Sequence, residues 1–103
     1  MKCVKAFVHH NRVGDLVHAL EVEEFRQVSL SDVRGLLSAI SPREQQYSVE
    51  LGGPVVSEVQ LEIYCDDGRV SRALEIVRSV ARTGHRGSGW VYVVPVEHAE
   101  SID

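Results

Sequence analysis

Hydrophobic residues switch between two spacings along this chain, and the order of the switches constrains the fold more than any other feature. Apolar side chains alternate with others from Val4 to His9 and, more clearly, from Val59 to Cys65, which is the period-two signature of a strand. After each strand they take the i, i+3, i+4, i+7 spacing of an amphipathic helix. The helical positions are Val13, Leu16, Val17 and Leu20, then Val70, Ala73, Leu74, Val77 and Val80 or Ala81. The chain therefore contains two strand–helix units.

Further signals complete this pattern. Asn11 is the expected N-cap of the first helix, and Gly84 is a natural stop for the second. Residues 27–37 predict a second strand, and Trp90–Val94 predicts a last strand before Pro95. The expected order, β-α-β-loop-β-α-β, is typical of an α+β, ferredoxin-like sandwich in which two helices cover one face of an antiparallel sheet.

Size and the predicted second face of the sheet both favour association between subunits. The chain has 103 residues, of which 44% are hydrophobic, and this length suits one domain with a modest core. A domain so small buries roughly two thirds of the surface of its unfolded chain. Phe7, Tyr64 and Tyr92 would leave the uncovered face partly apolar, so we expect sheet-to-sheet association between copies of the chain.

Charge and composition argue against several classes of function. The formal net charge is −4 and the eleven lysines and arginines are dispersed, which argues against nucleic acid as a partner. No apolar run approaches the ~20 residues of a membrane span, and the first residues alternate where a signal peptide would be uniformly apolar. We therefore expect a cytoplasmic protein without membrane insertion. Cys3 and Cys65 are expected to be reduced, with a disulfide as the alternative.

A long segment without sustained periodicity, residues 38–55, separates the two units. It contains breakers at Ser41-Pro42 and at Gly52-Gly53-Pro54. Loops longer than about 12 residues are uncommon in compact domains and are usually functional or disordered, so this segment is a candidate partner-binding element. The candidate contact residues are Arg43, Glu44, Gln45 and Tyr47. The alternative is a plain β-hairpin extension in which the alternating residues 47–51 form a short strand.

A glycine-rich turn joins the second predicted helix to the last strand. Gly84, Gly87 and Gly89 fall within six residues, between Arg82 and Trp90. Backbone N–H groups without side chains around them can converge on an anion while nearby arginines neutralise its charge. The turn therefore predicts a phosphate site, and the alternative is a plain connection between helix and strand.

The order of elements and this turn together resemble the PII signal-transduction proteins over nearly the whole chain. Residues 81–84 (Ala-Arg-Thr-Gly), with Gly87, Gly89 and the strand from Val93 onward, are similar to the B-loop region of that family. Residues 59–63 (Val-Gln-Leu-Glu-Ile) are similar to the strand after its T-loop. The resemblance implies a single domain over residues 1–103, with a βαββαβ subunit, a homotrimer and adenine nucleotides bound in clefts between subunits.

The resemblance also implies particular residues for this regulatory nucleotide. It places a T-loop-like segment at about 37–55 and the B-loop at 82–89. The phosphate-binding residues would be Arg82, Thr83, Gly84, Gly87, Ser88 and Gly89. The residues around adenine and ribose would be Ser29, Gly35, Glu62 and Tyr64. No catalytic residue, resident cofactor or metal ligand is expected.

Departures from the family's pattern change the expected ligand. Trp90 stands where PII proteins usually carry a lysine, and Ser101 and Asp103 stand where they place two arginines. Fewer charge-assisted contacts weaken triphosphate binding more than adenosine recognition, so we expect AMP or ADP to bind more tightly than ATP. Ala39 and Glu58 replace a glutamine and a basic residue that serve 2-oxoglutarate and magnesium in the family, which argues against 2-oxoglutarate sensing.

The better comparison is with PII-like relatives that report on inorganic carbon, redox state or metals, some of them associated with carboxysomes or bicarbonate transport. It implies an unidentified protein target, a transporter or an enzyme, and bicarbonate as a co-effector with Arg34, Arg43 or Arg86 as counter-charge. Two alternatives stay open. The pair His9-His10 suggests a metal-responsive, CutA-like trimer, although adjacent strand residues point to opposite faces. A small acylphosphatase-like hydrolase is the other, although the glycine turn has no amide side chain to orient water.

Overall fold

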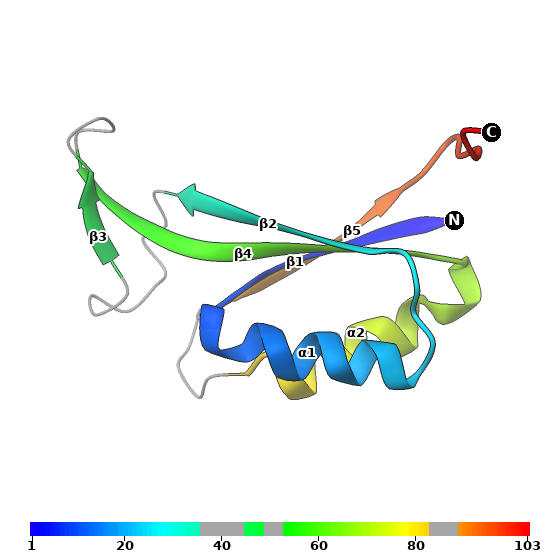
Figure 1. Cartoon of the computed structure of the whole chain (residues 1–103), viewed down its shortest axis with the longest axis horizontal. Coiled ribbons are helices and arrows are strands. Elements are labelled where there is room, and N and C mark those ends of the chain that lie inside the picture. The colour runs from blue at the N-terminus through cyan, green and yellow to red at the C-terminus, as the bar shows by residue number, and fades with distance from the viewer. Residues whose placement is uncertain (36–44, 49–52, 83–88) are drawn as a thin grey trace.

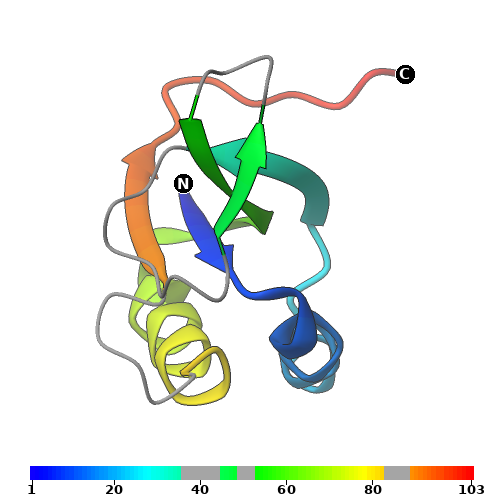
Figure 2. The same cartoon turned by 90° about the vertical axis from the view of Figure 1, so that its left-hand side faces the viewer.

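The structure is a computed structural model, and it describes residues 1–35, 45–48, 53–82 and 89–103. Its elements in chain order are β1 (Lys2–Val8), α1 (His10–Val22), β2 (Val28–Gly35), β3 (Gln45–Ser48), β4 (Gly53–Cys65), the 3₁₀ turn η1 (Asp67–Arg69), α2 (Val70–Val80) and β5 (Trp90–Pro95). The strands form one antiparallel sheet in the order β2-β4-β1-β5, and β3 pairs with the first part of β4. Both helices lie on the same face of this sheet (Figures 1 and 2). The predicted α+β, ferredoxin-like fold is confirmed.

The core lies between the sheet and the helices. Strand residues alternate in direction, so every second residue of β1 and β4 faces α1 and α2. The largest side chains that are fully buried there are Val4, Leu16, Leu20, Leu61 and Ile63. On the opposite face of the sheet, called the open face below, no helix of the described residues lies (Figure 2). Among the described residues no helix is long and apolar enough to cross a bilayer.

The prediction that Asn11 caps the first helix is wrong. The helix begins at His10, and His9 is the N-cap, with an extended backbone (φ −71°, ψ 144°). The ring Nδ1 of His9 accepts a hydrogen bond from the Asn11 backbone N–H at 3.4 Å, so it partners one of the donors that a helix start leaves unpaired. Asn11 instead lies in the first turn.

The segment predicted as a loop contains paired strands where the structure describes it. Residues 45–48 and 53–56 pair antiparallel, with Tyr47 opposite Pro54, as the hairpin alternative predicted. The short strand is Gln45–Ser48, earlier than the expected 47–51. Strand β4 begins at Gly53, so the prediction that the loop extends to residue 55 is wrong. Residues 36–44 and 49–52 lie outside the described chain.

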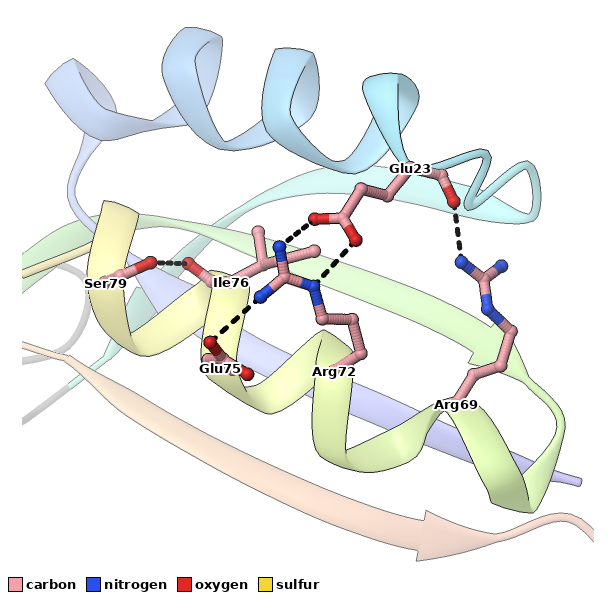
Figure 3. A network of polar contacts seen from close by, with 6 residues as sticks. All are labelled: Glu23, Arg69, Arg72, Glu75, Ile76 and Ser79. Carbon is pink, nitrogen blue, oxygen red and sulfur yellow. Dashed lines mark hydrogen bonds and ion pairs between the residues drawn. The ribbon is translucent and has the colours of Figure 1, made fainter.

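Arg72 of α2 and Arg69 of η1 contact the end of α1 (Figure 3). Arg72 forms an ion pair with Glu23 and a second one with Glu75 at 3.0 Å. Its Nε also donates to Glu23 Oε1 at 2.7 Å, and these hydrogen bonds hold the pKa of the Glu23 carboxyl below its ordinary value. Arg69 donates to the Glu23 carbonyl at 2.6 Å and lies 3.8 Å over the ring of Phe25. These contacts fix the turn through which the chain leaves α1 and enters β2.

Candidate functional site

Three of the predicted adenine and ribose residues lie together on the open face of the sheet. The register of β2 and β4 places Ser29 directly opposite Glu62. Tyr64 follows Glu62 by two residues on β4, so it points to the same face. Ser29 and Tyr64 are exposed and Glu62 is half-buried. The structure thus brings Ser29, Glu62 and Tyr64 into one polar cluster.

The carboxylate of Glu62 is the centre of this cluster. The Tyr64 hydroxyl donates to Glu62 Oε2 at 2.9 Å, and Gln60 Nε2 donates to Oε1 at 3.2 Å. The Cys3 thiol lies 3.8 Å from Oε2 and donates a weak, sulfur-type hydrogen bond. Oε2 therefore accepts from two neighbours, whereas Oε1 accepts only from Gln60 and keeps a lone pair for a ligand donor.

Sequence reasoning missed Gln60 and Cys3 as parts of this cluster. The alternation along β4 puts positions 60, 62 and 64 on one face, so the period-two pattern contained the signal for Gln60. Cys3 comes from β1, opposite Tyr64, and only the strand register brings it there. Cys3 and Cys65 are both free thiols, as expected, and burial raises the pKa of each thiol above its ordinary value.

The Tyr64 phenol should titrate at an unusually high pH. The carboxylate of Glu62 accepts its proton in a hydrogen bond, and this contact is the main cause that raises the pKa of Tyr64 to about 12. Because the folded-state pKa exceeds that of an unfolded tyrosine, about 10, the stabilisation is full below pH 10 and is lost as the pH rises through 12. Ultraviolet titration of the native chain and of Tyr64→Phe should differ by one step near pH 12. If Tyr64→Phe instead lacks a step near pH 10, Tyr64 titrates like an ordinary tyrosine, and this result would contradict the hydrogen bond to Glu62.

Gly35 is not part of the polar cluster. It is the last residue of β2 and lies opposite Val56. Ser29 is six residues away on the same strand, and at about 3.3 Å per residue the two positions are ~20 Å apart. Within one subunit, therefore, Gly35 and Ser29 cannot both contact a small ring such as adenine.

The predicted B-loop is described only at its two ends. Arg82 follows α2 and is exposed, and Gly89 directly precedes β5. A Cβ on Gly89 would lie 3.0 Å from the Phe7 carbonyl oxygen, so a side chain there would push the end of the turn away from β1. The other predicted phosphate residues, Thr83, Gly84, Gly87 and Ser88, lie outside the described residues.

Aromatic rings cover the part of the open face nearest this turn. Trp90 and Tyr92 stack with ring centroids 6.4 Å apart, and Phe7 meets Tyr92 edge-on at 6.0 Å. Trp90 and Tyr92 are each about half exposed, at 49% and 51%. The open face is therefore partly apolar, as the sequence predicted. At position 90, where the resemblance implies a lysine, this chain has the uncharged ring of tryptophan.

The remaining candidates are placed only in part. Gln45 and Tyr47 belong to β3, and Arg43 and Glu44 lie outside the described residues. Within the described chain no group of three or more His, Cys, Asp or Glu side chains is arranged to hold a metal ion. The His9 ring instead contacts Asn11 Oδ1 at 2.7 Å.

Comparison with known proteins decides the family. The sequence model of the family described as "Nitrogen regulatory protein P-II" matches residues 1–103. The chain belongs to the nitrogen regulatory protein P-II family. Nitrogen regulatory protein P-II 1 of Methanothermobacter thermautotrophicus is 29% identical over 96 residues, covering 93% of this chain and 84% of that protein. Nitrogen regulatory protein P-II of Azospirillum brasilense and that of Synechocystis are 24% and 27% identical over 102 residues, and each match covers 99% of this chain and 91% of the relative.

Membership confirms the resemblance on which the site prediction rests. P-II proteins are regulatory signal proteins, and a trimer that binds nucleotides and target proteins is typical of the family. In this P-II protein two of the predicted adenine and ribose residues, Glu62 and Tyr64, are joined by a hydrogen bond, and Gln60 donates to the same carboxylate.

Proposed function

We propose that this P-II protein is a non-enzymatic, homotrimeric sensor in the cytoplasm that binds AMP or ADP in clefts between subunits. The bound nucleotide biases the conformation of the T-loop-like segment, whose predicted range of 37–55 is shortened by the start of β4 at Gly53, and this segment then engages or releases a protein target, a transporter or an enzyme. Such coupling requires the nucleotide to bind the two states of that segment unequally. Bicarbonate acts as a co-effector at the same site.

The juxtaposition of Ser29, Glu62 and Tyr64 is the observation that carries this proposal. A hydroxyl, a carboxylate and a phenol on one face can accept from and donate to the amino group of adenine and the hydroxyls of ribose. The carboxylate of Glu62 is already oriented by Tyr64 and Gln60, at 2.9 and 3.2 Å. A preoriented acceptor loses little conformational entropy when the ligand arrives.

Two features of the described chain support a preference for fewer phosphates. Position 90 is the place at which the family's lysine would supply a positive charge, and in this chain it carries the apolar ring of tryptophan. This ring stacks on Tyr92. At the C-terminal positions, Asp103 is an acid where the family places an arginine. Its Oδ2 accepts a hydrogen bond from the Ser101 hydroxyl at 2.9 Å. An added γ-phosphate would lose water here without gaining a cationic partner, and it would meet an acid, so it would lower the affinity for the nucleotide.

Isothermal titration calorimetry with AMP, ADP, ATP and cyclic AMP tests the proposal directly. We expect AMP or ADP to bind at least about tenfold more tightly than ATP, an effect equal to one lost charge-assisted contact. Bicarbonate should strengthen the binding and 2-oxoglutarate should leave it unchanged. The absence of binding by any adenine nucleotide would overturn the sensor function, and tightest binding by ATP would overturn the proposed preference.

A further inference from the structure

Lys5 places a positive charge on the open face of the sheet. Its neighbours in β1, Val4 and Ala6, are buried in the core, so the Lys5 side chain points to the opposite face. Lys2 falls on the helix side of the same strand by this alternation, and β3, β4 and β5 contain no lysine or arginine. Of the strand side chains that the structure describes, Lys5 is therefore the one lysine or arginine on the open face.

The strand register places Lys5 in the middle of a row of residues that crosses the sheet. Lys5 is directly opposite Glu62 of β4 on one side and Tyr92 of β5 on the other. Glu62 is in turn opposite Ser29 of β2. Neighbouring strands lie about 4.8 Å apart, so the backbone of Lys5 is one strand spacing from Glu62 and two from Ser29. Lys5 therefore borders the cluster of Ser29, Glu62 and Tyr64.

The ammonium group of Lys5 has no hydrogen-bond or ion-pair partner among the described residues, although it is half-buried beside Glu62. The Glu62 carboxylate instead accepts from the Tyr64 hydroxyl and the Gln60 amide of its own strand. Burial is the main cause that raises the pKa of the Cys3 thiol, and the charges of Glu62 and Lys5 act on this thiol in opposite directions. The two charges thus lie near one thiol without pairing, and the ammonium keeps its three donors for a ligand.

A nucleotide on this cluster brings negative charge next to a carboxylate. The phosphate is joined to the same ribose whose hydroxyls would donate to Glu62, so phosphate and carboxylate repel each other across a short distance. Glu58, the other acid on the open face among the described strand residues, is buried and lies four residues along β4, about 13 Å away. The phosphate would therefore meet Glu62 first, and a cation beside Glu62 offsets the repulsion.

We propose that Lys5 binds the α-phosphate of the nucleotide whose adenosine part occupies the cluster around Glu62. This assignment rests on the proposed adenine nucleotide site and adds to it the residue that recognises the first phosphate. Position 90 carries tryptophan where the family's lysine would supply a charge, and Lys5 supplies one from β1. Lysine binds phosphate as a point charge, and one ammonium group neutralises one phosphate, in keeping with weaker binding of ATP.

Calorimetry with AMP and with adenosine, both in the absence of bicarbonate, tests this assignment. The variant Lys5→Met keeps the length of the side chain and removes its charge. We expect it to bind AMP at least about tenfold more weakly, the size of one charge-assisted contact, and to bind adenosine within about threefold of the native affinity. Because the lost contact is ionic, added salt should weaken AMP binding more steeply in the native protein than in the variant.

Lys2→Met is the matched control, with thermal unfolding of both variants as a check on the fold. It removes the same charge from the helix side of the same strand, so AMP should bind with the native affinity. An unchanged AMP affinity in Lys5→Met, or equal losses for AMP and adenosine, would overturn the assignment and leave the nucleotide sensor in place. Loss of the bicarbonate effect alone would assign Lys5 to bicarbonate and reject the phosphate contact. A native protein that binds no AMP would overturn the sensor and this assignment together.

Discussion

Replacing Leu61 by alanine is expected to lower the free energy of unfolding by about 2–5 kcal/mol, the usual cost of a cavity at a fully buried leucine. Leu61 has no exposed surface and lies on β4, with β1 on one side and β2 on the other. Its side chain faces the helices within the main hydrophobic cluster. Because sheet and helices both hold the backbone around it, the cavity cannot collapse easily. Denaturant unfolding followed by circular dichroism measures the change.

Leu30→Ala is the matched control for this loss. Leu30 lies directly opposite Leu61 in the register and on the same face, but it belongs to the edge strand and is 50% exposed. Removing it takes away about half as much buried surface and leaves no enclosed cavity, so we expect a loss of about 1 kcal/mol or less. Equal losses at the two positions would show that the helices do not enclose Leu61.

The sheet and both helices could be predicted because their apolar spacing is a direct consequence of burial. From residue 59 to residue 65 each apolar side chain faces the helices, and the alternation survives because β4 is central in the sheet. The same reasoning held for β1 and for α2, where the predicted Ala73 and Val77 are buried; Ile76 is buried too, although the predicted spacing left it out. These patterns are local, so no knowledge of distant residues was needed.

The beginning of β4 could not be read in this way, because its sequence contains the strand-breaking residues Gly53 and Pro54. Proline has no backbone N–H, and in sheets it is confined to positions where one side of the strand is unpaired. Among the described residues, Gly53, Pro54 and Val55 pair only with β3, so one side of the strand needs no donor from Pro54. The pairing context, which the sequence does not show, makes the proline acceptable.

Contacts between distant segments were the other part that local patterns could not give. The hydrogen bond from Cys3 to Glu62 joins residues 59 apart, and the bond from Arg72 to Glu23 joins residues 49 apart. Both depend on strand register and helix packing. The pairing of Ser29 with Glu62 was reached only through resemblance to a family, which supplies long-range placement that spacing along one chain does not.

Replacing Glu62 by alanine is expected to weaken AMP or ADP binding by about ten- to hundredfold. A hydrogen bond to a charged group contributes about 1.5–3 kcal/mol, and each 1.4 kcal/mol is a factor of ten in affinity. The substitution removes the only carboxylate in the cluster with Ser29 and Tyr64, and it also frees the Tyr64 hydroxyl from its 2.9 Å contact. Calorimetry on the folded variant measures the loss, with thermal unfolding as a check on the fold.

Gln60→Ala provides the comparison that gives this result its meaning. Gln60 lies on the same strand and face and donates to Glu62 at 3.2 Å, but it is not among the predicted nucleotide residues. Its loss removes one of the contacts that orient the carboxylate and leaves the charge in place, so we expect binding to change by less than about threefold, or ~0.7 kcal/mol. An unchanged affinity in Glu62→Ala would remove the open-face cluster from the nucleotide site. Equal weakening in both variants would mean that the orientation of the carboxylate matters more than its charge.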